Sequence, residues 1–335
     1  MVRNDINDFF SQNIKRPHLF ILGAGATMAT IPSGDKNGRK SSVMNNFLSA
    51  IGHADILSGI KLHTQSKNIE EIYSELAERP ECSEVKIKIE NAIYKHFAQL
   101  ELPDTPTLYD YLLISLRGKD CVATFNWDPL LLQAYNRVNK ITKDLPHLLF
   151  LHGCVSVGVC ENCGWAEPLQ NGSCYKCGGI LKPSKLMYPV VNKNYDQDIF
   201  IKRNKNIFLD FLEKGCIITI WGYSAPESDV MAKQLMIEAF NRGLHRLDYI
   251  EIIDIDNEDS LYKKWYKLAE HTNFHIKIYK NLLDSIIGEF PRRSVEGYTK
   301  RYFEGWWNGN ERLFSDINTF DKLAEVIQPL IESEI

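Results

Sequence analysis

Short apolar runs separated by amphipathic stretches organise most of this 335-residue chain. Apolar runs stand at residues 19–22, 121–125, 148–151, 216–221 and 249–254, and residues 274–279 alternate between apolar and polar. We predict that each is a β-strand, with the last at a sheet edge. Apolar residues at three- and four-residue steps predict a helix over 85–100, and shorter helices are expected at 68–79, 107–117 and 207–213. Strands alternating with helices indicate an α/β fold with a doubly wound, Rossmann-like, mainly parallel sheet.

Small or polar residues follow five of the predicted strands. They are Gly23, Ala24, Gly25, Ala26 and Thr27 after the first strand, Asn126 and Asp128 after the second, His152 after the third, Gly222 and Ser224 after the fourth, and Asp254 at the end of the fifth. Open parallel sheets bind ligands at the carboxyl ends of their strands. We therefore expect these residues to share one site.

Each of these residues also has a structural interpretation. A strand that feeds a Gly-x-Gly turn opening a helix suits a pyrophosphate, because backbone amides can approach the anion. The turn lacks the third glycine of the dinucleotide fingerprint, so a plain strand-to-helix turn is the alternative. Asp128 could form an Asx turn and helix cap, Asp254 could be a solvated loop charge, and His152 could be an ordinary core histidine. The polar loop 31–42 has enough glycine to be a mobile flap over a cofactor.

Two Cys-x-x-Cys pairs follow His152 closely. Ten residues separate Cys160 and Cys163 from Cys174 and Cys177. This spacing predicts one structural Zn²⁺ per chain, because four thiolates complete a tetrahedral site and leave no open position for chemistry. Disulfides or free core thiols are the alternative.

Charge and composition exclude several classes of protein. The formal net charge is −4 with both signs well mixed, so nothing indicates direct binding to nucleic acid. No uncharged apolar run approaches the roughly 18 residues that span a bilayer, and the amino-terminal residues lack the apolar region of a signal peptide. Cys82, Cys121, Cys154 and Cys216 show no pairing pattern, which is typical of a reducing compartment. We expect a cytoplasmic protein without a membrane segment.

The last part of the chain has a different pattern. Trp306 and Trp307 belong to an aromatic cluster, and apolar residues at helical steps follow over 320–331. Such an amphipathic helix most often packs on its own domain. A subunit or partner surface is the alternative, and we predict that this extension contributes to a homo-oligomer.

The order of the motifs resembles that of the sirtuin family. A Gly-Ala-Gly turn, an Asn-x-Asp, a His-Gly followed by a four-cysteine ribbon, and a Gly-Tyr-Ser stand in the family's order within roughly 18–285. The resemblance implies a sirtuin-like domain and a helical extension. The domain would cover 15–285, with Rossmann-like parts at 15–42, 105–153 and 185–285, a helical insertion at 43–104 and a zinc-ribbon insertion at 154–184, and the extension would cover 286–335.

The same resemblance implies a role for each candidate residue. Asn126 and His152 would be catalytic, with His152 as general base and Asn126 holding a ribose hydroxyl or the attacking water. The other contacts would run along NAD⁺ from its phosphates to its adenosine. They would come from Gly23, Ala24, Gly25, Ala26 and Thr27 at the phosphates, Asn126 and Asp128 at the nicotinamide side, Gly222 and Ser224 at the adenosine, and Asp254 at the adenine ribose.

Three departures from the family pattern bear on the reaction. The glutamine before Asn-x-Asp is Phe125 here, residues 32–35 replace the Pro-Asp-Phe-Arg loop with Arg39 as the nearest arginine, and residues 188–191 stand where a Phe-Gly-Glu loop belongs. The elements for NAD⁺ are kept, whereas those for acyl-lysine are not recognisable. This pattern resembles the sirtuin-like hydrolases of bacterial anti-phage defence, which cleave NAD⁺ to nicotinamide and ADP-ribose. A partner defence protein stays open, and an NAD-dependent deacylase or a non-catalytic NAD⁺ or ADP-ribose sensor is the alternative.

Overall fold

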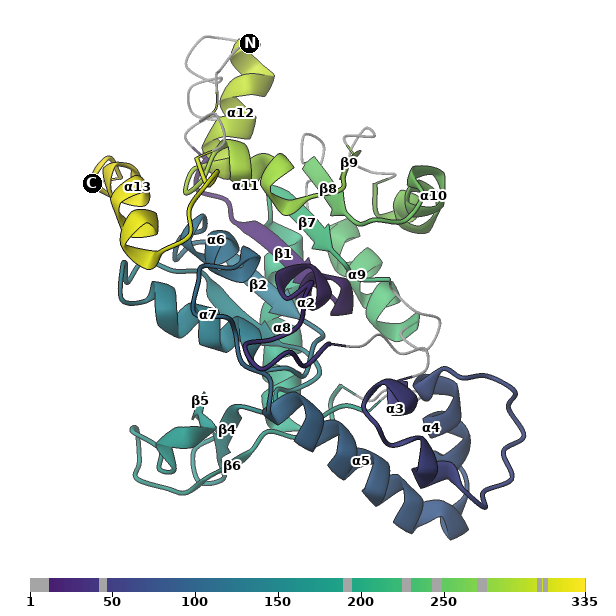
Figure 1. Ribbon diagram of the computed structural model, residues 1–335. Helices are drawn as coiled ribbons and strands as arrows, with labels where there is room; N and C mark the ends of the chain where they lie inside the picture. Colours follow the sequence, from purple (N-terminus) through teal and green to yellow (C-terminus); the bar gives the residue numbers. More distant parts are fainter. Residues whose placement is uncertain are drawn as a thin grey trace.

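The computed structural model describes residues 12–41, 47–188, 195–224, 230–242, 249–269, 276–305, 309 and 313–334. Its centre is a six-stranded sheet in the order β3-β2-β1-β7-β8-β9, in which every neighbouring pair is parallel (Figure 1). The strands are β1 (His18–Leu22), β2 (Cys121–Thr124), β3 (His147–Phe150), β7 (Ile217–Trp221), β8 (Tyr249–Ile253) and β9 (Ile276–Tyr279). The strand order reverses between β1 and β7, and open sheets of this kind bind ligands at the carboxyl ends on either side of such a reversal.

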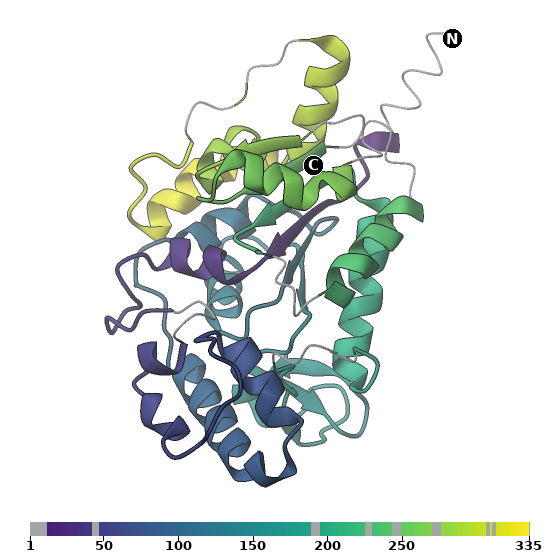
Figure 2. The ribbon, with the colours of Figure 1, turned by 90° about the vertical axis from the view of Figure 1, so that its right-hand side faces the viewer.

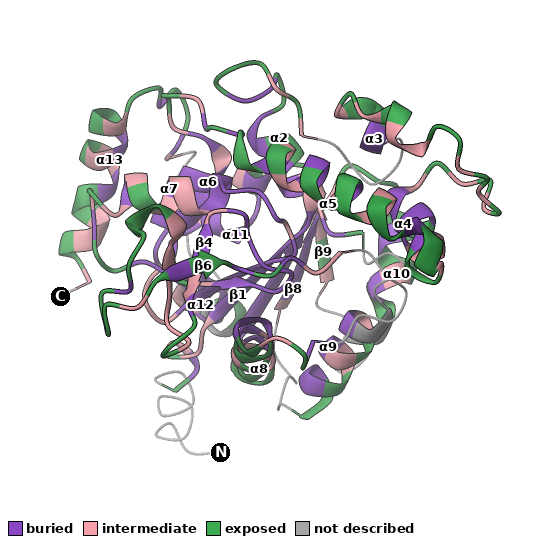
Figure 3. Ribbon diagram, turned by 90° about the horizontal axis from the view of Figure 1, so that it is seen from below, coloured by how far each residue is buried: buried purple, intermediate pink, exposed green. Residues whose placement is uncertain are grey.

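Helices cover both faces of the sheet, because alternate residues of each strand point to opposite sides. Phe20 and Leu22 pack in one apolar cluster with α2 (Ala24–Thr30), α6 (Leu108–Ile114) and α7 (Leu130–Val138). Leu19 and Ile21 pack in a second cluster with α8 (Ile199–Lys214), α9 (Val230–Arg242) and α10 (Glu258–Ala269). The central strands β1, β2 and β7 are buried along their whole length, whereas the edge strands β3 and β9 are partly exposed (Figure 3). The predicted doubly wound α/β fold is confirmed, with β9 at a sheet edge.

Two smaller elements lie below the sheet in Figures 1 and 2. The first is helical and consists of α3 (Phe47–Ala50), η1 (Ala54–Leu57), α4 (Ile69–Ala77), η2 (Pro80–Cys82) and α5 (Ser83–Ala98). The second is a three-stranded antiparallel ribbon of β5 (Ala166–Pro168), β4 (Val157–Cys160) and β6 (Leu181–Pro183), with η3 (Leu169–Asn171). The division of the chain into a sirtuin-like domain with two insertions and an extension stays a prediction.

Helix α8 is longer than the expected helix at 207–213. It begins at Ile199, because the Asp198 carboxylate caps it by accepting the backbone amides of Phe200 and Ile201 at 3.0 Å. The polar run at 202–206 obscures the helical period in the sequence. This extra length brings the start of α8 close to the carboxyl end of β3, where the Asn204 amide oxygen accepts the backbone amide of Phe150 at 2.9 Å.

The carboxyl-terminal segment packs on the sheet layer of its own chain. It forms η5 (Leu282–Asp284), α11 (Ile286–Glu289), α12 (Ser294–Glu304) and α13 (Phe320–Glu332), with α13 near α6 in Figure 1. Leu323 and Ile327 of α13 are fully buried in the cluster that contains α6. Tyr111 of α6 also donates its hydroxyl hydrogen to the Ile317 carbonyl at 2.8 Å.

The apolar stripe of α13 is therefore covered by residues of the same chain. Self-association stays a prediction that this stripe does not support, and Trp306 and Trp307 lie outside the described residues. Among the described residues, no helix combines the length and apolarity of a membrane span.

Arg292 ties this segment to the sheet layer. Its guanidinium is fully buried and donates to both carboxylate oxygens of Glu334 at 2.6 and 2.9 Å and to a carboxylate oxygen of Asp144 at 3.1 Å. It also reaches the carbonyls of Ile114 and Leu116 at 3.3 Å, at the end of α6. Removal of a buried cation with this many partners is strongly destabilising, because buried acceptors lose their donor.

We predict that Arg292→Met lowers the free energy of unfolding by roughly 3 kcal/mol, because it leaves the Glu334 carboxylate and two carbonyls without their donor. Urea unfolding followed by circular dichroism measures the change. Arg293→Met is the matched control, since the neighbouring Arg293 donates to Ser333 at the surface. Equal losses in the two variants would contradict the anchoring role of Arg292.

Candidate functional site

The turns that follow β1 and β7 are in direct backbone contact. The amide of Gly23 donates to the Trp221 carbonyl at 3.1 Å, and the amide of Gly25 donates to the Gly222 carbonyl at 2.9 Å. Gly222 has a φ of +60°, and a Cβ placed on it would lie 2.3 Å from the Ala26 nitrogen. Only glycine fits there. The two turns therefore interlock at the point where the strand order reverses.

Asn126 is attached to the turn after β1. Its side-chain nitrogen donates to the Gly23 carbonyl at 2.8 Å and to the Thr27 hydroxyl oxygen at 3.0 Å. Asn126 is partly exposed, and its amide oxygen accepts no hydrogen bond from the residues that the structure describes. The side chain is thus oriented by the turn, with the oxygen left for a ligand or water.

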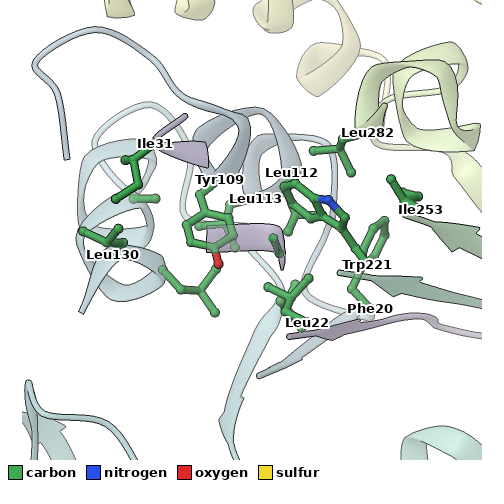
Figure 4. Close-up of a cluster of buried hydrophobic side chains, with 14 of the residues drawn as sticks. Phe20, Leu22, Ile31, Tyr109, Leu112, Leu113, Leu130, Trp221, Ile253 and Leu282 are labelled. Atoms are coloured by element: carbon green, nitrogen blue, oxygen red, sulfur yellow. The ribbon is translucent and has the colours of Figure 1, made fainter. Parts of the chain in front are cut away.

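A buried polar network lies behind Asn126. The Thr27 hydroxyl donates to the Asp128 carboxylate at 2.8 Å and lies 2.8 Å from the Tyr109 hydroxyl, which must then be the donor in that second bond. Burial raises the pKa values of Asp128 and Tyr109, and in Asp128 the bond from Thr27 partly offsets this effect. Figure 4 shows Tyr109 enclosed by apolar side chains, and its ring meets the edge of Trp221 with centroids 5.8 Å apart.

Asp128 also makes the contact expected of an Asx turn at the start of a helix. Its second carboxylate oxygen accepts the backbone amide of Leu130 at 3.0 Å, where α7 begins. Thr27 and Asp128 are both buried, so their observed contacts fix the turn and Asn126. A direct role of either side chain toward NAD⁺ stays a prediction.

His152 belongs to a second network, on the opposite face of the sheet. Its Nε2 lies 2.8 Å from the Tyr195 hydroxyl, and both side chains are buried. Phe125 meets the His152 ring edge-on at 4.9 Å and stacks on Tyr223 at 4.3 Å. Phe125 and Asn126 are neighbours in sequence, so the end of β2 joins the aromatic network to the polar one.

Ser224 and Asp254, the candidates for the adenosine side, make fewer contacts that would orient them than Asn126 does. Ser224 is exposed, and residues 225–229 after it lie outside the described part of the chain. The Asp254 carboxylate accepts the amide of Asp256 at 3.0 Å, as in an Asx turn, and the side chain is partly exposed. Their roles toward adenosine stay predictions.

The loop expected to be a mobile flap is tied to the helical insertion over its described residues. The Asp35 carboxylate accepts the amides of Asn37, Arg39 and Glu101 at 2.8, 2.7 and 3.1 Å. The first two of these bonds form a local turn, and the third crosses to the segment after α5. Glycine content suggested mobility, but one buried carboxylate organises the loop.

The four ribbon cysteines converge, and together they could hold a zinc ion. Their sulfur atoms all lie within 4.8 Å of one another, with Cys160–Cys177 at 3.4 Å and Cys163–Cys174 at 3.6 Å. A disulfide bond is about 2.05 Å long, whereas sulfurs around a tetrahedral zinc with bonds of about 2.3 Å are roughly 3.8 Å apart. The distances therefore favour a metal site over disulfides. No position is left open for catalysis.

Two residues of the site could not be found in the sequence. Tyr109 lies in α6, 82 residues from Thr27, and Tyr195 lies before α8, 43 residues from His152. Neither has a motif around it. Only the tertiary structure brings their hydroxyls to Thr27 and His152.

Comparison with known proteins finds similar chains among solved structures. No family model and no curated protein matches the chain. Among solved structures, an ADP-ribose complex of a Sir2 homologue variant is 14% identical, with a TM-score of 0.42 over 92% of this chain and all of the other. A Sir2 complex with a p53 peptide and NAD⁺ is 12% identical, with a TM-score of 0.37 over 91% and 99%. Similarity this low does not identify the reaction of this site.

We predict that Gly222→Ala lowers the free energy of unfolding by about 2 kcal/mol more than Gly59→Ala. Both glycines have positive φ, at +60° and +81°, but a Cβ at Gly59 meets no atom within 4 Å. The control thus carries the cost of backbone conformation alone. Thermal and urea unfolding measure the difference, and equal effects would show that the contact between the two turns is unimportant. Gly25→Val is not a clean test of ligand binding, because its side chain would meet the Gly222 backbone.

Proposed function

We propose that this protein is a sirtuin-like NAD⁺ glycohydrolase, which uses water to cleave NAD⁺ into nicotinamide and ADP-ribose. The observation that carries the proposal is the attachment of Asn126 to the glycine turn at the reversal of the strand order. A ligand that lies in that crevice meets the turn, Asn126 and the end of β7 together. The motif order of the sirtuins supports NAD⁺ as that ligand.

The reaction needs no general acid for the leaving group, but it needs an acceptor for one proton from water. The bond between the ribose anomeric carbon and the nicotinamide nitrogen breaks, and nicotinamide departs neutral because its ring nitrogen keeps the electron pair. Water forms the new bond to the anomeric carbon and releases one proton. The free amide oxygen of Asn126 would hold a ribose hydroxyl or this water, and His152 would accept the proton.

Phe125 supports hydrolysis over deacylation. It stands where the sirtuin resemblance expects a glutamine, and its ring is stacked between Tyr223 and the edge of His152. An aromatic ring there offers no amide to a ribose or an acylated co-substrate. It also keeps this side of the crevice apolar, which strengthens hydrogen bonds made next to it.

The proposal includes a structural zinc ion in the ribbon. Cys160, Cys163, Cys174 and Cys177 would hold one Zn²⁺ per chain and so stabilise the ribbon, without a part in the reaction. The resemblance further supports a role in bacterial anti-phage defence, and with it a cytoplasmic location. We also propose that the protein is a homo-oligomer. A partner defence protein is an open question. These are parts of the proposal that rest on the motifs alone.

We predict that Asn126→Ala and His152→Ala each reduce nicotinamide release by roughly 10²-fold or more, through lost positioning and a lost proton acceptor. Asn136→Ala and His147→Ala, at exposed positions of α7 and β3, are the matched controls and should keep full activity. Product chromatography after incubation with NAD⁺ measures the rates, and circular dichroism checks folding.

The same experiment separates hydrolase from deacylase. A hydrolase releases nicotinamide and ADP-ribose from NAD⁺ alone. If nicotinamide appears only with an acetyl-lysine peptide, together with acetyl-ADP-ribose, the proposed hydrolysis is wrong. Full activity of Asn126→Ala would contradict the role of Asn126 on which the proposal rests.

For the metal, we predict one zinc per chain in protein purified under reducing conditions, and its loss in Cys174→Ser with destabilisation of the ribbon. Elemental analysis and limited proteolysis of the ribbon measure the two effects. Cys82→Ser is the control, since Cys82 lies in η2 outside the ribbon. Zinc-free wild-type protein would contradict the assignment.

A further inference from the structure

Tyr109 is a fully buried residue behind Asn126 that no sequence motif indicates. Its hydroxyl lies 2.8 Å from the Thr27 hydroxyl and 3.5 Å from the Asn126 Nδ2. Only 1% of Tyr109 and 1% of Thr27 is exposed, so water cannot replace this contact if it is lost. A hydrogen bond shielded from water in this way constrains its partners strongly.

The Thr27 hydroxyl is the point where three side chains meet. It accepts a hydrogen bond from the Asn126 Nδ2 at 3.0 Å, and it lies 2.8 Å from both the Asp128 carboxylate and the Tyr109 hydroxyl. A hydroxyl group has one hydrogen and two lone pairs. The three contacts use all of them, whichever way the hydrogens between Thr27, Asp128 and Tyr109 are shared. Each contact therefore restricts the rotation of Thr27 and, through it, the side chain of Asn126.

The position of Tyr109 is fixed by the start of α6. The Asp110 carboxylate closes the first turn of this helix by accepting the amide and the hydroxyl of Thr107, each at 2.7 Å, and it also accepts the Arg137 guanidinium of α7 at 3.1 Å. The Tyr109 ring meets the edge of Trp221 and packs in the cluster of β1, α2 and α6 (Figure 4). Capping and packing therefore present the tyrosine hydroxyl from a rigid element.

The orientation of the Asn126 amide decides what this residue offers to a ligand. One end of the amide is an acceptor and the other is a donor, so a half-turn of the group would exchange them. The Gly23 carbonyl and the Thr27 hydroxyl both bind Nδ2, which leaves the amide oxygen for a ribose hydroxyl or for water. If Thr27 rotates away, the contact with Gly23 alone must keep the amide in this orientation.

We propose that Tyr109 is a positioning residue for Asn126 in the NAD⁺ hydrolysis proposed above. Through Thr27, its hydroxyl keeps the Asn126 Nδ2 on the glycine turn and so keeps the amide oxygen available to the ribose hydroxyl or the water. Tyr109 touches no ligand and transfers no proton. The catalytic effect rests on the proposed function, whereas the control of the Asn126 amide rests on the structure alone.

A double-mutant cycle tests whether Tyr109 acts through Asn126. We expect Tyr109→Phe, which removes only the hydroxyl, to lower kcat for nicotinamide release about 10-fold. The same substitution should have no further effect in Asn126→Ala, because the group that Tyr109 positions is then gone. Tyr111→Phe is the matched control, since Tyr111 lies in the same helix and its hydroxyl bonds to Ile317. It should leave kcat unchanged in both backgrounds.

A spectroscopic test does not depend on activity. In protein labelled with ¹⁵N-asparagine, the side-chain amide signals of Asn126, assigned with Asn126→Ala, report its hydrogen bonds. We expect Tyr109→Phe to shift these signals and to speed the exchange of the amide hydrogens with solvent about 10-fold, whereas Tyr111→Phe should leave both unchanged. Thr27→Val removes the shared hydroxyl and should have the same effect, and it replaces Tyr109→Phe if that variant does not fold. Thr27→Ser keeps the hydroxyl and should keep the signals.

The outcomes separate this inference from the proposed function. If the wild-type protein cleaves NAD⁺ and Tyr109→Phe matches its rate, or lowers kcat equally with and without Asn126, the positioning role is wrong. Unchanged Asn126 signals in Tyr109→Phe or in Thr27→Val would also overturn it. If the wild-type protein cleaves no NAD⁺ but the Asn126 signals change as expected, hydrolysis fails while the control of the amide stands.

Discussion

The contact between two glycine turns is the constraint on which the rest of the site depends. Gly25 and Gly222 meet backbone to backbone, and a single Cβ at either position would collide with main-chain atoms of the other turn. Main-chain atoms cannot move aside as a flexible side chain can. The carboxyl ends of β1 and β7 are therefore held at one separation, and everything attached to them takes its position from that contact.

Two networks extend from this contact along opposite faces of the sheet. On one face the network is polar, and Thr27 joins Asn126 to a buried carboxyl group and a buried phenol. On the other it is aromatic, and Phe125 packs between Tyr223 and His152. Consecutive residues at a strand end point to opposite faces. The peptide bond between Phe125 and Asn126 thus links the two networks covalently.

The outer parts of the molecule are stabilised by other means. The ribbon has a small apolar cluster of Cys160, Cys174 and Leu181, and its four cysteines could hold a zinc ion. The carboxyl-terminal segment instead shares the main core and is fastened by the buried Arg292. An isolated apolar stripe in a sequence gives no sign of which neighbour covers it, and here the neighbour is α6.

The sequence by itself determined the fold class and the positions of the candidate site residues along it, since both depend on short-range patterns. Apolar runs at strand length, a Gly-x-Gly turn and paired Cys-x-x-Cys motifs are visible within a few residues of chain. Tertiary structure decided which groups these residues meet. The Tyr109 and Tyr195 hydroxyls, the contact of Gly222 with Ala26 and the burial of α13 all join segments distant in sequence. Such contacts follow from the order of strands in the sheet, and no local spacing records that order.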